Sequence, residues 1–191
     1  MIDKILINEI EAYYPQTKQH WRKWLDKNHV QKASVWLILY KQKVGKPTIT
    51  WSDAVDEALC YGWIDSIRKT LDEERSIQFF SKRKAKSTWS KINKQKVQLL
   101  IETGLMTKAG LDCIEIAKQN GSWEILDSVE ELIIPADLEK ELLKNINAMD
   151  IFLALSKSVR KAMLHRIQLA KRPETRLKRI LEILEFVAKG N

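Results

Sequence analysis

A helical pattern followed directly by two extended runs occupies residues 51–81 and constrains the fold more than any other part of the chain. Apolar residues recur at helical spacing over residues 51–59, which predicts an amphipathic helix with one buried face. Gly62 follows at a position where a left-handed helix cap favours glycine. Residues 63–71 and 76–81 have the composition of strands and are joined by the acidic turn D-E-E-R. We therefore expect a helix that leads into an antiparallel β-hairpin.

A third strand is predicted before this helix. Residues 33–40 read A-S-V-W-L-I-L-Y, a β-branched and aromatic run with the length of one strand. Residues 1–15 are ambiguous between strand and loop, whereas the chain has helical patterns from Ser87 to Gly190. The sequence thus predicts a predominantly helical α+β fold. A small antiparallel sheet of about three strands lies in its N-terminal half, packed against helices, and its C-terminal part is all helical.

The domain organisation follows from length and composition. The chain has 191 residues, of which 45% are hydrophobic and 30% charged, and it contains no internal repeat, low-complexity tract or long linker. Such a chain is long enough to form one well-cored domain. We expect a single domain over residues 1–191, in which an α+β core of residues 1–125 carries a helical extension, residues 126–191, packed on it.

Composition also excludes several classes of protein. No apolar run approaches the ~20 residues that a membrane-spanning helix needs, and the acidic N-terminal stretch argues against a secretory signal. Two cysteines are too few for a disulfide framework. The three histidines are far apart and no glycine-rich phosphate loop is present. We expect a cytoplasmic protein with neither a metal nor a cofactor.

Positive charge is concentrated in two segments. Residues 82–96 hold seven Lys or Arg and no acid, and residues 157–191 hold ten Lys or Arg against three Glu. Two interpretations stay open for these segments: contact with the phosphate backbone of a nucleic acid, or contact with an acidic partner or a neighbouring carboxylate. The candidate basic patch in the second segment consists of Arg166, Lys171, Arg172, Arg176 and Arg179.

The hairpin and the residues after it supply a candidate ligand site. Strand alternation places Trp63, Asp65 and Ile67 on one face, so Asp65 faces apolar residues and needs a partner. The planar guanidinium of Arg83 can hold that carboxylate or bind a ligand carboxylate or phosphate. A structural ion pair and a ligand site both stay open. The candidate ligand-binding residues are Trp63, Asp65, Arg83, Trp89 and Asn93.

Few residues suggest catalysis. Asp65 is the candidate general base if the site is catalytic. Cys60 lies away from the apolar stripe, near the end of its predicted helix and beside Asp56 and Glu57. The helix dipole and these acids disfavour a thiolate there, which favours packing over nucleophilic attack. Cys113 falls on the apolar stripe of a later helix and is expected in the core.

Several strings resemble a known family. A-L-C-Y-G-W-I-D-S at 58–66, F-F-S-K-R-K at 79–84 and A-K-R-P-E-T-R-L-K-R-I at 170–180 resemble the YdeI/OmpD-associated (OmdA-like) family of bacterial proteins, whose name describes bacteriocin protection. The resemblance runs in order from about Trp21 to Gly190. It implies a cytoplasmic, stress-associated protein and supplies no reaction.

Two departures from the family pattern stand out. Lys82 replaces a proline that members usually carry, so the approach to Arg83 is less rigid. Ile125 and Leu126 replace an Ala-Tyr pair, so a tyrosine hydroxyl is absent there.

Together these features favour a binding protein over an enzyme. We expect it to take a small anionic ligand or a protein partner at the candidate ligand-binding residues. Two alternatives stay open: an enzyme of unknown reaction that uses Asp65 as acid or base, and an accessory protein that contacts nucleic acid through its basic segments. The oligomeric state is left open.

Overall fold

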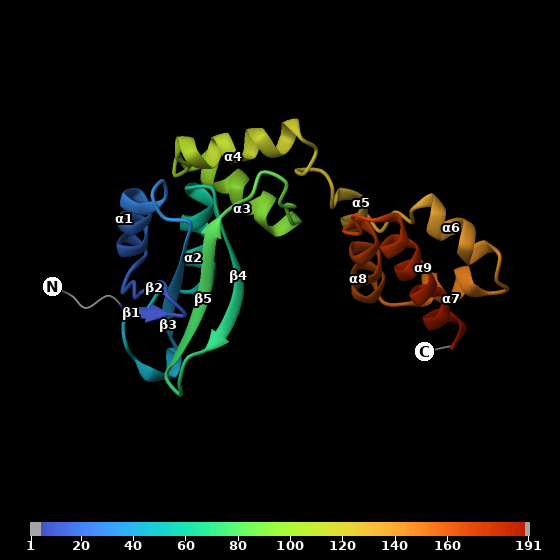
Figure 1. Ribbon diagram of the computed structural model, residues 1–191, viewed down its shortest axis with the longest axis horizontal. Coiled ribbons are helices and arrows are strands. Elements are labelled where there is room, and N and C mark those ends of the chain that lie inside the picture. Colours follow the sequence, from blue (N-terminus) through green and yellow to red (C-terminus); the bar gives the residue numbers. More distant parts are fainter. Residues whose placement is uncertain (1–4, 190–191) are drawn as a thin grey trace. The chain divides into compact units, whose positions relative to one another are not determined.

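The computed structural model describes residues 5–189 of the chain (Figure 1). The chain divides into two compact units: residues 1–87 with 92–122, and residues 88–91 with 123–191. The packing of a helical extension on the core to form a single domain therefore stays a prediction. The predicted helix end at Gly190 and the first four residues of the ambiguous N-terminal stretch lie outside the described residues.

The first unit contains a five-stranded mixed sheet (Figure 1). The predicted strand and hairpin are confirmed and pair antiparallel, in the order β3, β5, β4. Two short strands extend the sheet beyond the expected three, and β2 runs parallel to β3 because a helix connects them as a crossover. The strands are β1 (Ile5–Ile7), β2 (Ile10–Tyr13), β3 (Ser34–Tyr40), β4 (Trp63–Thr70) and β5 (Arg75–Lys82).

A register shift in β4 changes which of its side chains face the helices. Asp65 pairs with Phe80, whereas Arg68 pairs with Gln78, so β4 holds one extra residue, as in a β-bulge. Ile67 is 55% exposed. The expectation that it shares the face of Trp63 and Asp65 is wrong, because strict alternation stops at the bulge.

The helices of the first unit begin where the sequence predicts helix caps. The Thr17 side chain accepts a hydrogen bond from the His20 N–H, and the Thr50 side chain accepts one from the Asp53 N–H. A short 3₁₀ helix, η1 (Gln42–Val44), lies between β3 and the helix that Thr50 caps. The α-helices are α1 (Lys18–Asn28), α2 (Trp51–Cys60), α3 (Lys91–Glu102) and α4 (Lys108–Gln119).

The core of the first unit lies between the sheet and α1 and is rich in tryptophan. Trp21 and Trp24 stack with ring centroids 5.1 Å apart. Trp21 also contacts Phe80 of β5 at 5.5 Å, and Trp24 contacts Trp63 of β4 at 5.9 Å. The indole N–H of Trp21 donates to the Ala54 carbonyl of α2 at 3.0 Å, so one buried side chain connects α1, α2 and the sheet.

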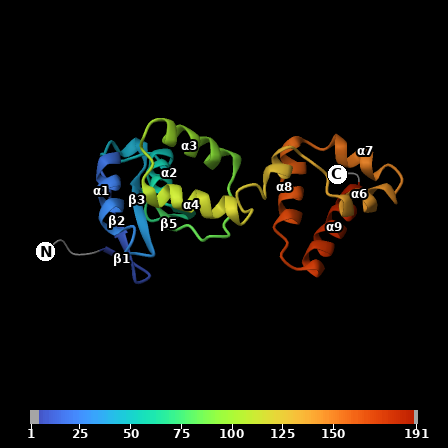
Figure 2. The same cartoon turned by 90° about the horizontal axis from the view of Figure 1, so that it is seen from above.

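The second unit is a bundle of helices in which α8 and α9 lie side by side (Figure 2). Pro173 starts α9, as predicted from its tolerance at a first helical position. Ser156, rather than the expected Ser158, caps α8. Leu138, Phe152 and Leu164 are fully buried in the core of the second unit. The helices are α5 (Asp127–Glu130), α6 (Ala136–Leu143), α7 (Ala148–Ala154), α8 (Lys157–Gln168) and α9 (Pro173–Ala188).

Among residues 5–189, no helix combines the length and apolar character needed to cross a membrane.

Candidate functional site

A cavity of about 410 Å³ in the first unit lies where α2 ends and β4 begins, and its lining includes Trp63 and Arg83. Trp63 forms part of its floor and is 1% exposed. The other walls come from the end of α1, the segment after β5 and one face of α4. Those walls include His29, Val30, Lys82, Ala109, Cys113 and Ile116.

The turn between α2 and β4 requires glycine for two reasons. Gly62 has φ +70°, a left-handed conformation that other residues adopt at a cost. A Cβ at this position would lie 3.1 Å from the Ala109 carbonyl oxygen and 3.2 Å from the Cys113 Cβ. The Gly62 carbonyl accepts the Arg83 N–H at 2.9 Å. The glycine therefore lets α4 approach the turn and anchors the backbone that carries Arg83.

A second close approach fixes the start of α4. The Thr107 N–H and hydroxyl both donate to the Cys60 carbonyl, at 3.2 and 2.6 Å. A Cβ on Gly110 would come within 2.4 Å of the same oxygen. The end of α2 is thus bonded directly to the start of α4, which sets the position of the α4 wall of the cavity.

Arg83, with Lys82, supplies the positive charge of the cavity. It is 9% exposed, and burial lowers its pKa to about 10, although the Cys113 thiol and the Asp65 carboxylate favour its charged form. The guanidinium is consequently charged at neutral pH. Burial raises the pKa of the Cys113 thiol and Arg83 opposes this shift, so Cys113 carries its proton at neutral pH.

Asp65 has a partner that sequence reasoning missed. Its carboxylate accepts the indole N–H of Trp51 at 2.8 Å and the amide N–H of Gln78 at 3.4 Å. Trp51 was expected on the apolar stripe of its helix but is 44% exposed. The pairing joins a helix to a strand, so no local periodicity could signal it. Asp65 is absent from the described residues that line the cavity.

The other two predicted ligand-binding residues lie elsewhere in the chain. Trp89 belongs to the second unit, where its ring lies 4.9 Å from that of Trp123. Asn93 is half-buried in α3. A single ligand site made from all five candidate residues therefore stays a prediction, and so does a role for Asp65 as a general base.

The structure agrees with the packing role predicted for Cys60 but not with the core position predicted for Cys113. Cys60 is fully buried, because Thr107 and Gly110 bring α4 directly over it, and the charged groups of Arg22 and Glu57 act on its thiol. Burial raises the pKa of its thiol. Cys113 was expected in the core but is half-buried in the cavity wall, because the apolar stripe of α4 faces the turn at Gly62.

Several residues of the basic patch serve contacts within the second unit. Arg176 donates to the Asp137 carboxylate at 2.5 and 2.8 Å, and Arg166 pairs with Glu182 at 2.5 Å. Arg179 donates to the backbone carbonyl of Arg166. In this unit, the A-K-R-P-E-T-R string therefore supplies Arg176, whose ion pair with Asp137 joins α9 to α6.

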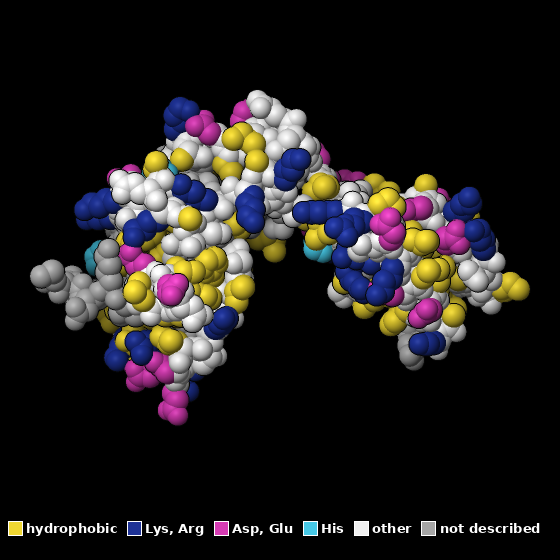
Figure 3. Space-filling view, viewed as in Figure 1, with side chains coloured by type: hydrophobic (Ala, Val, Ile, Leu, Met, Phe, Trp, Pro, Cys, Tyr) yellow, Lys and Arg dark blue, Asp and Glu magenta, His cyan; other side chains and the backbone are white. Residues whose placement is uncertain are grey.

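Other positive charges of this unit remain on the surface. Lys171 and Arg172 are exposed. Helix α8 carries four Lys or Arg and no acid, and Figure 3 shows Lys and Arg side chains gathered over it. The use of these residues to bind a partner stays a prediction. Within residues 5–189, no cluster of three or more His, Cys, Asp or Glu has an arrangement that could hold a metal ion.

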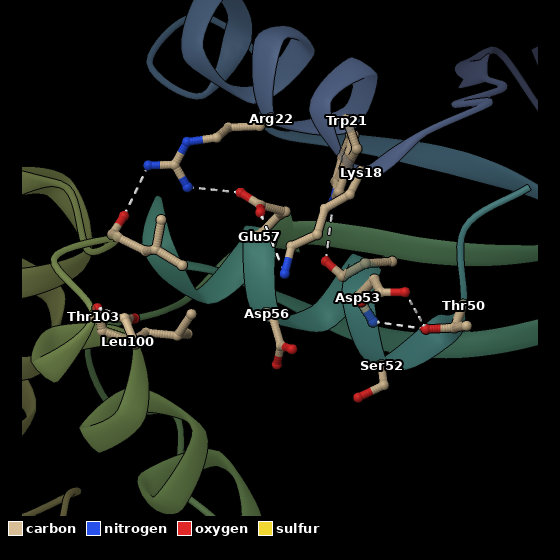
Figure 4. A network of polar contacts seen from close by, with 12 residues as sticks. Lys18, Trp21, Arg22, Thr50, Ser52, Asp53, Asp56, Glu57, Leu100 and Thr103 are labelled. Carbon is tan, nitrogen blue, oxygen red and sulfur yellow. Dashed lines mark hydrogen bonds and ion pairs between the residues drawn. The ribbon is translucent and has the colours of Figure 1, made fainter.

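A buried carboxylate in the first unit binds two cations (Figure 4). Glu57 of α2 is 3% exposed. It accepts the Arg22 guanidinium at 2.7 Å and lies 3.7 Å from the Lys18 ammonium. Arg22 also donates to the Leu105 carbonyl at 2.8 Å. The network ties α1 to α2 and to the loop before α4.

Comparison with protein families separates the two halves of the chain. Residues 13–113 match the family described as "Domain of unknown function (DUF8412)". Residues 131–190 match the family described as "Bacteriocin-protection, YdeI or OmpD-Associated" (OmdA), which confirms the resemblance drawn from the sequence over that part of the chain. No curated protein and no solved structure matches the chain significantly. The chain therefore belongs to the DUF8412 family, and its residues 131–190 are similar to the YdeI/OmpD-associated bacteriocin-protection family.

Proposed function

We propose that the first unit binds a small organic anion in the cavity beside Arg83. The observation that carries this proposal is a charged guanidinium, nine-tenths buried, in the wall of a cavity of about 410 Å³. Ligand pockets in proteins commonly measure about 300–1,000 Å³ and combine apolar walls with a few polar groups. The dimensions and the lining of this cavity support such a role.

The walls suggest the chemical class of the ligand. Val30 and Ile116 offer apolar surface, which favours a ligand with a hydrocarbon or aromatic body. A guanidinium binds carboxylate and phosphate oxygens through two parallel hydrogen bonds. A small carboxylate or phosphate with an apolar body therefore fits this cavity best.

The proposal is one of binding, without a reaction. Asp65 is bonded to Trp51 and lies outside the lining of the cavity. The thiol of Cys113, whose pKa burial raises, is a weak nucleophile at neutral pH. We place this binding in the cytoplasm, where two free cysteines suit a reducing environment, and in a protective response of the kind that the OmdA family name describes.

A thermal-shift screen tests the proposal. The protein is mixed with a panel of monocarboxylates and phosphate monoesters, since a ligand present at 100 times its Kd stabilises the native state by about 2.7 kcal/mol. We expect at least one anion to raise the Tm of the wild type and to lose this effect in Arg83→Gln. The control is Arg68→Gln on the exposed part of β4. Absence of any stabilising anion, or equal stabilisation of Arg83→Gln, would overturn the proposal.

A second candidate function is binding of nucleic acid by α8, which carries four Lys or Arg and no acid, although two of the four, Lys161 and Arg166, also pair with Glu130 and Glu182. Fluorescence anisotropy with a labelled 20-base-pair duplex, measured across salt concentrations, tests it. Each phosphate contact contributes a slope of about −0.9 to the logarithm of affinity against the logarithm of salt. Lys157→Glu should weaken binding more than Lys140→Glu on α6. Equal effects of the two changes contradict this candidate.

A further inference from the structure

A second cavity, of about 480 Å³, adjoins the cavity beside Arg83. The two cavities share one lining residue, Tyr61. Helix α1 contributes Gln19, Arg22 and Asp26 to the second cavity and leads to His29 in the first. Residues at this spacing occupy one face of a helix. From Gln19 to His29 that face extends about 15 Å, because a helix rises 1.5 Å per residue.

The opposite walls follow α4 in the same way. Thr107, which precedes the first turn of α4, lines the second cavity. Ala109, Cys113 and Ile116 line the first and lie on one face of that helix. Each cavity is thus lined by α1 or its C-terminal end on one side and by α4 or the residue before it on the other, and we call the two together the α1–α4 groove.

Tyr61 is held firmly between the two parts of the groove. Its ring centroid lies 5.1 Å from that of His29, which lines the first cavity. The Arg22 guanidinium, which lines the second, lies 5.5 Å from the same ring. The hydroxyl donates to the Asp26 carboxylate at 3.4 Å. A ligand that occupies both parts of the groove must therefore pass Tyr61, which is 6% exposed.

Each part of the groove has its own positive charge. Arg83 serves the first cavity and Lys23 the second, whereas Arg22, which also lines the second, already pairs with Glu57 at 2.7 Å. Of the acids in the two linings, Asp112 pairs with Lys108 at 2.7 Å, whereas Asp26 accepts from the neutral hydroxyl of Tyr61 and keeps its negative charge beside Lys23. The electrostatic pattern is cationic, then aromatic, then cationic.

We infer that the α1–α4 groove binds an elongated ligand with an anionic group at each end and an apolar segment that crosses Tyr61. The chemical class is that of linear dicarboxylates. This inference rests on the proposed function, since one anionic group occupies the cavity beside Arg83. An ammonium group at the far end would face Arg22 and Lys23, which disfavours ligands with opposite charges at their two ends.

Lys23 offers the sharpest test because it is exposed and takes no part in the Arg22–Glu57 network. Binding is measured by titration calorimetry with linear dicarboxylates of increasing length, from succinate to dodecanedioate, and with monocarboxylates of the same lengths. The proteins are the wild type, Lys23→Glu, Arg83→Gln and the matched control Lys27→Glu. Lys27 is an exposed lysine one turn further along α1 and does not line the groove.

We expect dicarboxylates to bind more tightly than monocarboxylates, with an optimum at an intermediate chain length. Lys23→Glu replaces an attraction of the size of a surface ion pair by a similar repulsion, so it should weaken dicarboxylate binding about tenfold. It should leave monocarboxylate binding unchanged. Lys27→Glu should change neither.

The outcomes separate this inference from the function on which it rests. If monocarboxylates bind in an Arg83-dependent way, but dicarboxylates gain nothing and Lys23→Glu has no effect, the inference fails and the proposed function stands. If no acid binds in an Arg83-dependent way, both fail. Tighter binding of ω-amino acids than of dicarboxylates of equal length also overturns the inference. Circular dichroism of each variant confirms that it is folded.

Discussion

Replacing Arg22 by methionine is expected to destabilise the contact between α1 and α2, because it leaves the Glu57 carboxylate buried with one distant cation. Removal of one partner from a buried ion pair costs about 3–5 kcal/mol. The Glu57 side chain is 4% exposed, whereas that of Arg22 is 31% exposed. Water therefore screens part of the interaction, and we expect a loss of about 2 kcal/mol.

Hydrogen exchange followed by mass spectrometry suits this measurement. A chain with two compact units can unfold in more than one step, whereas exchange reports the local opening free energy of each helix. A loss of about 2 kcal/mol corresponds to roughly 30-fold faster exchange of the α1 and α2 amides. The amides of α8 and α9, which belong to the second unit, should exchange at the wild-type rate.

Lys108→Met is the matched control. Lys108 and Asp112 form an ion pair of 2.7 Å whose side chains are 87% and 55% exposed, so its loss should cost about 0.3–0.5 kcal/mol. A double-mutant cycle of Arg22→Met with Glu57→Gln should give a coupling of about 1–2 kcal/mol. If Arg22→Met accelerates exchange no more than Lys108→Met does, burial of Glu57 does not determine the strength of this contact.

Three further predictions concern other parts of the molecule. Gly62→Ala should cost about 1–3 kcal/mol more than Gly45→Ala in urea unfolding, because both glycines have positive φ but only the Cβ at Gly62 meets α4; equal costs contradict the close approach. Arg176 lowers the pKa of Asp137 below 3.8, so the stability from this pair is present above pH 3.8 and lost as the pH falls further. In a series of Tm measurements at different pH values, the Tm of Arg176→Ala should therefore fall less below pH 3.8 than that of the wild type. Iodoacetamide should label Cys113 in the native protein faster at pH 9 than at pH 7, since burial raises its thiol pKa; a pH-independent rate, measured by mass spectrometry, refutes this.

The regular elements were predictable where the pattern was long. The run that forms β3 and the two runs that form β4 and β5 each have seven or eight residues, enough for strand composition to stand out. The strands β1 and β2 have three and four residues. Runs that short do not distinguish strand from loop, and the parallel pairing of β2 depends on the helix that follows it.

The candidate site was less predictable because its contacts join distant segments. The helical wheel placed Glu57 with the polar residues of α2, but Lys18 and Arg22 reach it from α1 and allow it to be buried. Cys60 follows the same logic, since it is covered by α4. In both cases the helical pattern correctly predicts which side chains share a face of α2. Burial is decided by an element that lies far along the chain.

The strings that carry the family resemblance have structural explanations, and this narrows where ligand specificity can lie. In G-W-I-D-S, Gly62 admits α4 and Asp65 holds Trp51. In A-K-R-P-E-T-R, Arg176 bonds α9 to α6. Changes at residues with such roles should lower the stability of the fold, whatever the ligand. Lys23, by contrast, is exposed and takes no part in the Arg22–Glu57 network. A change at Lys23 should therefore alter which anions bind to the proposed groove and leave the fold intact.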